Sequence, residues 1–301
     1  MGASIIRFLQ QKTGVEITVL TRRKQHGTGN VSYVQWDAKT PGRWTKAIDE
    51  CDAVINLVGK SVNCRYTEQN RNEIIRSRVD ATLAIGKAID QSSHPPAIWI
   101  NPGSAAIFGN ESDGIKDEHS LAGNGFSAEV CKQWEQAFFS TNTPFTRKVV
   151  LRMGLVFQKD IGLLQPFIKL AKAGFGGSIG SGNQYLSWIH ENDFLNVIYH
   201  SLVDESYEGI IHCTSPNPVT NKHFMKALGG ALHTKVALPN PAVLVNLGAR
   251  IIGTEPALVL TGRRVISQIL KEKEFNFQYP VIEDALQHLI NKAQVDNFVK
   301  V

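Results

Sequence analysis

The chain has 301 residues, a formal charge of +5 and 43% apolar residues, so it can bury a large core as one α/β domain or as a domain with an appendage. No apolar run approaches the roughly 18 residues of a membrane span, and the N-terminus lacks a secretory-signal pattern, which predicts no membrane partner. Basic residues are dispersed outside the cluster at 21–24, which argues against nucleic acid as a partner.

The four cysteines are too widely spaced for a zinc site or a disulfide framework, so no metal is expected. They are Cys51, Cys64, Cys131 and Cys213. We interpret them as core or surface thiols.

Short β-branched runs alternate with longer segments of helical period, which is typical of a mostly parallel sheet covered by helices. The predicted strands are 16–20, 31–34, 53–57, 97–100 and 148–152. Small and apolar residues recur at spacings of three and four between Asn72 and Asp90, which predicts a helix there. A second helix is predicted from about Phe126 to Phe139.

Glycine-rich loops follow Arg152, at 174–177 and 180–182, and helical patterns occupy the chain from about Leu238 onward, ending in an amphipathic helix. We therefore divide the chain into a sheet domain over 1–155, a substrate-side region over 156–237 that is interleaved with the core, and a C-terminal helical segment over 238–301. No internal repeat is visible.

Six segments occur in the order that one known family shows. They are Cys51–Gly59, Ser77–Thr82, Gly103–Gly109, Trp134–Glu135, Leu186–Asp193 and Thr261–Val265. On these segments nearly the whole chain resembles the extended short-chain dehydrogenase/reductases, within them an atypical epimerase-like branch with an extra C-terminal helical segment. The resemblance implies a doubly wound, Rossmann-like α/β fold whose first domain binds a dinucleotide.

The glycine-rich turn of that domain is nearly absent from this sequence. In a doubly wound fold the first strand leads into G-x-x-G-x-x-G, which holds the pyrophosphate at a helix N-terminus. Here only Gly2 can match the last glycine. The resemblance thus implies that the central first strand is missing, and that its neighbours lack a ladder partner.

Two interpretations of this gap stay open: a truncated isoform or start-site choice, or a protein that has lost ordinary dinucleotide binding. With either, we expect the chain to bind nucleotide poorly and to be less stable than a version with the strand restored. A cytoplasmic location is expected, and an organellar one stays open because the N-terminus looks truncated.

The resemblance also implies which nucleotide is bound. The strand ending at Leu20 leads to a turn where NAD-preferring relatives carry an acidic residue. Arg22, beside Thr21, suits the 2′-phosphate of NADP instead, because a guanidinium can pair bidentately with phosphate. The other interpretation is a solvated basic turn. NADP is therefore predicted, and NAD is less favoured.

Further cofactor contacts are implied along the sheet. Asp37 matches an acidic side chain near the adenine, and the small Gly59 would let the backbone approach the nicotinamide half. Glu73 and Arg78 are either cofactor ligands or a surface ion pair. The full predicted set is Gly2, Thr21, Arg22, Asp37, Leu57, Val58, Gly59, Glu73, Arg78 and Val156.

Catalysis in the family uses a Ser and a Tyr-x-x-x-Lys pair, in which the Lys lowers the pKa of the Tyr. Ser104 matches the serine, whereas Ser127 stands at the Tyr position and Cys131 at the Lys position. A serine hydroxyl is a far weaker acid than a phenol, and a Cys carries no positive charge. The ordinary proton relay is therefore predicted to be missing, and rescue by the adjacent Lys132 would need a change of helical register.

Weaker hypotheses concern the second half. A His190/Asp193 pair is less favoured than a strand-to-helix corner in which Asp193 caps a helix starting near Phe194. The loop at 174–182 either admits substrate or is only flexible, and the Thr261–Arg264 turn either touches substrate or binds another subunit, which allows a homodimer.

The sequence thus predicts an NADP(H)-dependent oxidoreductase or epimerase-like protein acting on an unknown small molecule. By family analogy a sugar nucleotide is one candidate substrate. The alternatives are a non-catalytic NADP(H)-binding protein and a scaffold. The substrate, the reaction and the oligomeric state do not follow from the residues.

Overall fold

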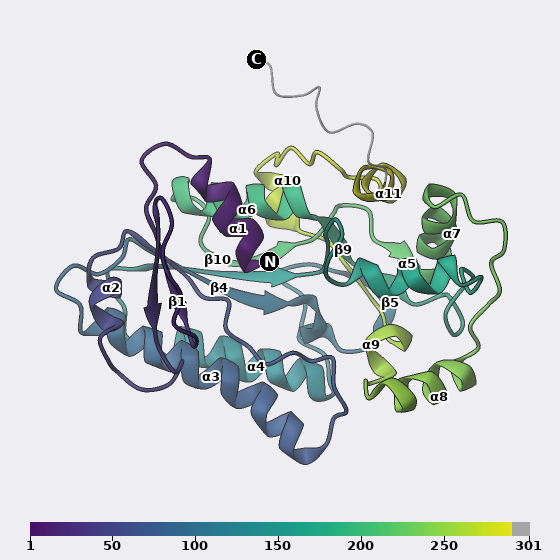
Figure 1. Cartoon of the computed structure of the whole chain (residues 1–301), viewed down its shortest axis with the longest axis horizontal. Coiled ribbons are helices and arrows are strands. Elements are labelled where there is room, and N and C mark those ends of the chain that lie inside the picture. The colour runs from purple at the N-terminus through teal and green to yellow at the C-terminus, as the bar shows by residue number, and fades with distance from the viewer. Residues whose placement is uncertain (291–301) are drawn as a thin grey trace.

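The computed structural model describes residues 1–290, so the end of the predicted C-terminal segment, 291–301, lies outside it. At its centre is a four-stranded parallel sheet in the order β10-β6-β4-β3. These strands are β3 (Ala53–Ile55), β4 (Ile98–Ser104), β6 (Arg147–Met153) and β10 (Gly209–Cys213). Figure 1 shows α3 (Glu68–Asp90) and α4 (Phe126–Phe139) below the sheet, and α1 (Gly2–Gln10) and α6 (Glu191–Val203) above it. The predicted α/β architecture is confirmed.

Two strands stand apart from this sheet. β1 (Ile17–Thr21) and β2 (Val31–Gln35) pair in parallel, with Ile17 opposite Val31, while β3 forms an edge of the central sheet. Within residues 1–290, then, β1 and β3 each have a strand on one side only. This confirms the expectation that the neighbours of a central first strand lack a ladder partner.

The helices below the sheet form as their sequences predict. Thr67 caps α3, since its hydroxyl accepts from the backbone N–H of Asn70 at 3.2 Å. The buried face of α3 packs with α4, and Trp99 meets Phe138 edge-on at 4.5 Å beneath β4. The carboxyl ends of the parallel strands all point to the same side, where a doubly wound fold binds its ligands.

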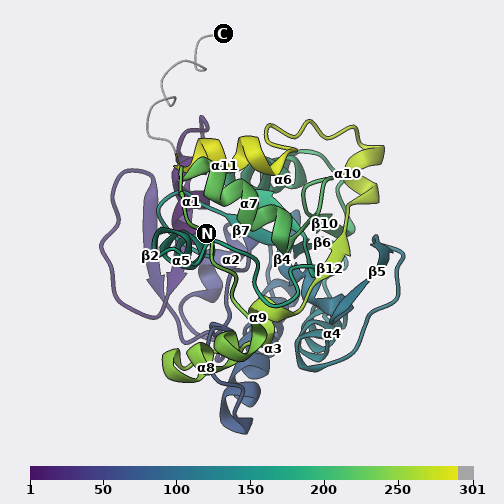
Figure 2. The ribbon, with the colours of Figure 1, turned by 90° about the vertical axis from the view of Figure 1, so that its right-hand side faces the viewer.

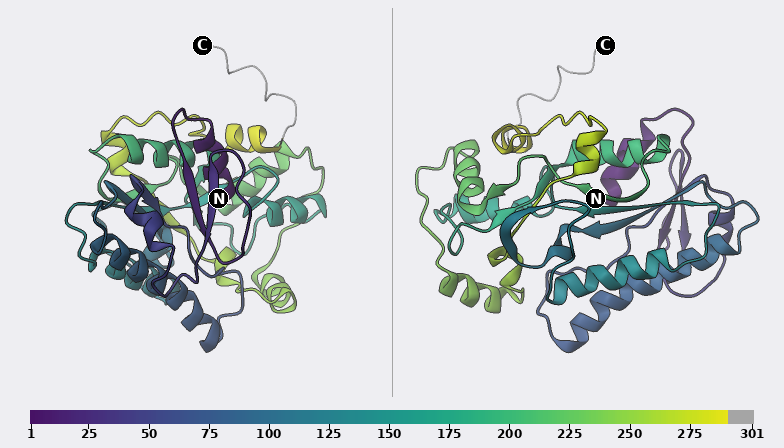
Figure 3. Two further views of the ribbon diagram at one scale, coloured as in Figure 1. Left: turned by 60° about the vertical axis from the view of Figure 1, so that its left-hand side comes forward. Right: turned by 180° about the vertical axis from the view of Figure 1, so that it is seen from behind.

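A second core lies beyond those strand ends. It packs α5, α7 and the C-terminal helix α11 around Phe157, Trp188 and Phe224. The elements of this half are β7 (Leu155–Phe157), α5 (Leu164–Lys172), β8 (Tyr185–Leu186), β9 (Trp188–His190), β11 (Val219–Thr220), α7 (Asn221–Ala231), α8 (Ala242–Ile252), α9 (Ala257–Leu260) and α11 (Ile282–Ile290). Figures 2 and 3 show how these helices gather around one end of the sheet.

The C-terminal segment is tied to the sheet domain by a parallel strand pair. β12 (Arg263–Val265) runs beside β5 (Glu111–Lys116). Just before it, Gly262 fits against Tyr185, whose backbone nitrogen would lie 2.5 Å from an added Cβ. The segment Thr261–Arg264, which was interpreted from the sequence as a turn, therefore leads into β12. The other short elements are α2 (Thr45–Asp49), a 3₁₀ turn, η1 (Ala105–Phe108), and α10 (Gln268–Glu272), which packs on β10 in the main core.

The predicted cap of α6 is wrong. Helix α6 begins at Glu191, and His190 caps it, because its Nδ1 accepts from the N–H of Asn192 at 3.0 Å. Asp193 lies inside the first turn and accepts instead from the backbone N–H groups of Gln278 and Tyr279, at 2.7 and 3.0 Å. The Asp193 carboxylate therefore fixes the C-terminal segment onto the core, and His190 caps the N-terminus of α6.

Among the described residues, no helix is long and apolar enough to cross a membrane. No group of three or more His, Cys, Asp or Glu side chains in residues 1–290 could hold a metal ion.

Candidate cofactor and active site

A buried amide network fixes the carboxyl ends of β3 and β4. The Asn56 side chain donates to Asn101 Oδ1 at 2.7 Å, and its own Oδ1 accepts from the backbone N–H of Val58 at 3.0 Å. Thr82 of α3 joins the network, since its hydroxyl accepts from the Asn56 amide at 3.4 Å and from the indole N–H of Trp134 at 3.1 Å. These bonds set the path of the chain through the predicted cofactor residues 57–59.

Gly59 lies directly against the guanidinium of Arg78. A Cβ on Gly59 would stand 3.0 Å from Arg78 Cζ, so the small residue is needed here for close packing against Arg78. The guanidinium donates to the backbone carbonyls of Lys60 and Ile74, at 3.0 and 2.9 Å, and lies over the ring of Trp134. Burial lowers the pKa of Arg78 from its usual value.

The Glu73–Arg78 ion pair considered from sequence does not form. Glu73 pairs with Lys60, whose ammonium also donates to Asn70 Oδ1 at 2.8 Å. This pairing holds the pKa of Glu73 below its usual value. The geometry leaves Arg78 with backbone carbonyl partners and an aromatic face, in a half-buried place beside the strand ends.

A hollow of about 430 Å³ lies at the end of β1, lined by Thr21, Arg22 and Arg23. Arg22 is exposed there. Three side chains that carry hydrogen-bond donors therefore line the place that the sequence predicts for the 2′-phosphate. Asp37, expected near the adenine, is exposed and accepts from the backbone N–H groups of Lys39 and Thr40. Its bonds with Thr40 and Lys39 lower its pKa to about 2, so it is ionised at neutral pH.

The N-terminus of α1 meets the end of β3. A Cβ on Gly2 would stand 3.6 Å from the Leu57 side chain, so the first turn of this nine-residue helix adjoins the predicted cofactor strand. Its free N–H groups and dipole suit a phosphate. Val156, by contrast, is 5% exposed in the main core and pairs with Ile189 across β7 and β9. A cofactor role for its side chain stays a prediction.

The three predicted catalytic positions lie near these strand ends. Ser104 ends β4, and its hydroxyl accepts from the N–H of Ala106 at 3.2 Å. Ser127 lies in the first turn of α4, and Cys131 is buried one turn later. Burial, with the charge of Glu135, raises the pKa of Cys131 to about 12. This thiol is neutral at physiological pH and supplies no positive charge.

Tyr66 is a residue that the sequence analysis missed. It lies half-buried in the loop between β3 and α3, where burial raises the pKa of its phenol and Ser127 opposes this rise. Its ring packs edge-on against Phe126, with the centroids 4.8 Å apart. Its backbone N–H donates to Glu255 Oε2 at 3.3 Å. No motif marks Tyr66, and only the folded loop brings it to the start of α4.

Behind the site, a buried ion pair joins α4 to β6. Arg152 donates to both carboxylate oxygens of Glu135 at 2.8 Å, and each residue is 7% exposed. Gly103 of β4 lies against both, since a Cβ there would be 3.3 Å from Glu135 Oε1. The pair therefore sets how closely α4, with Ser127 and Cys131, approaches the end of β4.

His190 belongs to a separate aromatic cluster. Its Nε2 is 3.1 Å from Nδ1 of His288, and its ring stacks on Tyr279. Burial, with the neighbouring His288, lowers its pKa to about 3, so His190 is neutral at physiological pH. With its other nitrogen capping α6, both ring nitrogens have structural partners. This geometry favours the structural corner over a catalytic His190.

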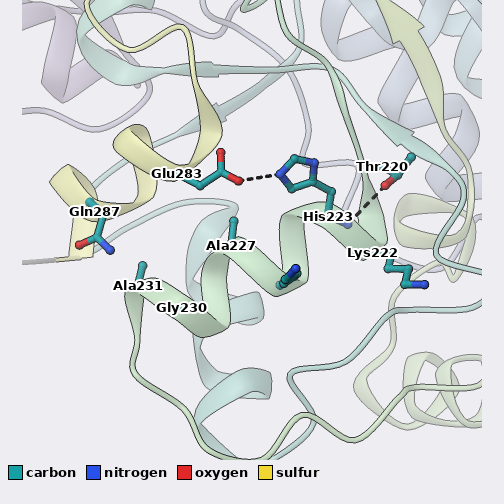
Figure 4. A pocket seen from close by; sticks show the side chains of 9 residues that line it. Thr220, Lys222, His223, Ala227, Gly230, Ala231, Glu283 and Gln287 are labelled. Atoms are coloured by element: carbon teal, nitrogen blue, oxygen red, sulfur yellow. Dashed lines mark hydrogen bonds and ion pairs between the residues drawn. The ribbon is translucent and has the colours of Figure 1, made fainter.

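A second hollow, of about 470 Å³, opens between α7 and α11. It is lined by Thr220, Lys222, His223, Lys226, Ala227, Gly230, Ala231, Glu283 and Gln287. Figure 4 shows His223 between Thr220 and Glu283, whose Oε1 is 2.6 Å from His223 Nε2. None of the predicted cofactor or catalytic residues lines this hollow.

Comparison with known proteins gives one domain match and several relatives. Residues 241–289 match the family described as a domain of unknown function, DUF1731. The chain is 32% identical to the Arabidopsis thaliana protein "Epimerase family protein SDR39U1 homolog, chloroplastic" over 82% of this chain and 71% of that protein. It is 30% identical to "Epimerase family protein SSP1921" of Staphylococcus saprophyticus, over 97% of this chain and 96% of that protein.

Solved structures resemble the whole described fold. The crystal structure of human epimerase family protein SDR39U1 (isoform 2) with NADPH matches with a TM-score of 0.83 and 26% identity, over 96% of this chain and 95% of that one. A nucleoside-diphosphate sugar epimerase from Corynebacterium glutamicum matches with a TM-score of 0.70 and 23% identity, over 96% of this chain and 61% of that one. The second likeness concerns the fold alone.

Proposed function

The chain belongs to the epimerase family of extended short-chain dehydrogenase/reductases that includes SDR39U1, and from this premise we propose that it binds NADP(H) as an epimerase-like oxidoreductase acting on a small molecule. When bound, the nicotinamide accepts or supplies hydride. The chain's own residues bind, orient and move a proton. A sugar nucleotide is the substrate class that family analogy suggests, and it rests on analogy alone.

One observation carries the choice of NADP over NAD: the basic hollow at Thr21, Arg22 and Arg23 at the carboxyl end of β1. A 2′-phosphate needs cationic donors at this position, whereas a free ribose hydroxyl needs an acceptor. The first turn of α1 supports the proposal because it offers backbone N–H groups beside Leu57. The NADPH bound to human SDR39U1 supports the same choice.

Fluorescence titration of the purified chain with NADPH and with NADH tests this proposal. We expect tighter binding of NADPH, and Arg22→Ala should weaken NADPH by about tenfold or more, because a hydrogen bond to a charged group contributes about 1.5–3 kcal/mol. NADH affinity should change little. Arg250→Ala, on the exposed side of α8, is the matched control. Equal affinities for the two nucleotides in the unaltered chain would refute the NADP assignment.

A non-catalytic NADP(H)-binding protein is the second candidate. It is supported by the chemistry of α4, where Ser127 and the neutral, buried Cys131 replace an acid and its activating cation. A chain that binds NADPH tightly and reduces no carbonyl compound would favour this candidate.

We also propose a cytoplasmic location. An organellar one remains an alternative, since the Arabidopsis thaliana relative is named chloroplastic. Homodimer formation is a further proposal, and sedimentation of the purified chain would test it.

A further inference from the structure

Strand β12 carries a guanidinium that has no counter-charge in the protein. The Nε atom of Arg263 is buried and has no hydrogen-bond partner among the described residues. Its Nη2 atom donates to Thr261 Oγ1 at 3.0 Å, and none of the ion pairs within residues 1–290 includes this arginine. A charge removed from water without a partner costs stability, so the position of Arg263 calls for an explanation outside the fold.

Two carboxylates in this part of the fold are paired with other cations. Glu111 stands opposite Arg263 in the register of β5 and β12, but its carboxylate lies 3.9 Å from the ammonium of Lys116. Glu135 of α4 accepts two hydrogen bonds from Arg152. Because a guanidinium stays protonated in proteins, Arg263 keeps a positive charge that these neighbours do not neutralise.

The geometry of β12 directs Arg263 towards the end of β4. Successive side chains of a strand point to opposite faces, so Arg263 and Val265 share one face of β12. Val265 packs in a buried cluster with Cys131 of α4 and with the 3₁₀ turn η1, which directly follows Ser104. Arg263 as a whole is half-buried, so it lies at the edge of this cluster and not within it. Its charge is therefore on the side of β12 that faces the candidate active site.

A second guanidinium without a carboxylate approaches the same helix. Arg78 of α3 lies 5.1 Å from the ring centroid of Trp134, and it donates to two backbone carbonyls. Trp134 and Cys131 are three residues apart on α4, so they lie on one face of that helix. Positive charges from α3 and from β12 therefore flank this face beside the strand ends, and a field of one sign attracts a ligand of the other.

Resting on the proposed function, we propose that Arg263 binds an anionic group of the substrate, a carboxylate or a phosphate, beside Ser104, and so selects carbonyl compounds that carry such a group. A guanidinium has five N–H donors in a planar fork that matches both groups, and only the bond to Thr261 is made within the described residues. Thr261 is then a positioning residue. Of the two roles that its sequence allows, the Thr261–Arg264 segment takes the one at the substrate.

The rival explanation is a structural arginine that holds β12 in place through Thr261. Arg263→Gln removes the charge, and Arg263→Lys keeps the charge without the planar fork. Arg250→Gln, at an exposed position on α8, is the matched control for the loss of an arginine. Glu111→Gln shows whether the carboxylate opposite Arg263 serves as its counter-charge in solution.

Melting curves of each full-length variant without ligand separate the two explanations first. We expect Arg263→Gln to leave the melting temperature unchanged or to raise it, because the change removes a partly buried charge that has no partner. Glu111→Gln should also leave it unchanged, since the pair with Lys116 is partly exposed. A structural arginine predicts the opposite result for Arg263→Gln.

The melting curves are then repeated with benzoate, phenyl phosphate and neutral benzamide, with sodium chloride of equal ionic strength as the reference. We expect benzoate or phenyl phosphate to raise the melting temperature of the unaltered chain and of Arg250→Gln above the chloride reference, and benzamide to have no effect. Whichever of the two anions gives the larger rise identifies the group as a carboxylate or a phosphate. Arg263→Gln should weaken anion binding about tenfold or more, and Arg263→Lys should weaken it less. NADPH affinity, measured by fluorescence, should change by less than about twofold in Arg263→Gln.

Several outcomes would overturn the assignment. One is a rise with both anions that does not exceed the chloride reference, or that Arg263→Gln leaves unchanged. Another is a tenfold loss of NADPH affinity in Arg263→Gln, which would place the arginine in the cofactor site. A third is a dimer that Arg263→Gln dissociates in sedimentation, which would place it at a subunit contact. Failure of the unaltered chain to bind NADPH would contradict the proposed function instead, and the anion series would still decide the role of Arg263.

Discussion

Replacing Glu135 by alanine would leave the guanidinium of Arg152 buried without its carboxylate. The two side chains form two parallel hydrogen bonds of 2.8 Å, and both are 7% exposed, so water cannot readily replace the lost partner. The remaining neighbours compensate little: Nε2 of His212 is 3.5 Å from the guanidinium, and the ring of Phe108 lies 5.7 Å away. The variant would therefore contain an uncompensated buried cation.

Removing one partner of a buried pair destabilises a protein by about 3–5 kcal/mol. We expect that loss in the free energy of unfolding for Glu135→Ala. The double variant Glu135→Leu/Arg152→Met should recover most of it, because it removes both charges and keeps the volume. The exposed pair between His223 and Glu283 gives the matched control, and Glu283→Ala should cost less than about 1 kcal/mol.

Urea unfolding followed by circular dichroism measures all three free energies, provided that the slope against urea stays constant. A loss below about 1 kcal/mol in Glu135→Ala would refute the reasoning, since it would mean that the guanidinium finds water or another acceptor. A double variant as unstable as the single one would instead assign the loss to packing between α4 and β6.

The sequence predicted the strands whose burial is decided locally. β1, β2, β3, β4 and β6 all fall on predicted β-branched runs, because branched residues fit a pleated, partly buried strand. β10, at the other edge of the central sheet, was not predicted. β5 was missed because its sequence, Glu111 to Lys116, is polar and contains a glycine. Its partner β12 lies far away in the chain, at Arg263–Val265, so no local pattern records the pairing.

In the candidate site, too, the sequence located residues related within one element and missed those that only the fold brings together. Aligning α4 on Trp134 and Glu135 located Ser127 and Cys131 in the helix, since helical period alone fixes their relation. The partner of Glu73 could not be found in this way, because Lys60 precedes α3 in a loop whose path depends on the fold. Tyr66 was missed for that reason as well: its ring contact with Phe126 exists only after the β3–α3 loop has folded onto α4.

Three further predictions follow from individual contacts. Gly86→Ala in α3 should lower the melting temperature despite a gain in helix propensity, because the new Cβ would lie 2.3 Å from Thr141 Cγ2. Gly248→Ala in α8 has open space around it and should raise the melting temperature. Cys131→Lys, read by thermal melting against Cys131→Ala, should destabilise the fold more than the control, because it buries an ammonium where the neighbouring carboxylate of Glu135 is already paired with Arg152. The pKa of the buried His190 is about 3 in the folded chain, whereas the usual histidine pKa is about 6.5. The free energy of unfolding should therefore fall as the pH drops from about 6.5 towards 3, because the unfolded chain binds a proton at this residue and the folded chain does not. The slope from this residue should reach at most about 1.4 kcal/mol per pH unit, and His190→Asn, which can still cap α6, should flatten it; an unchanged slope in urea unfolding across this range would show that His190 does not resist protonation.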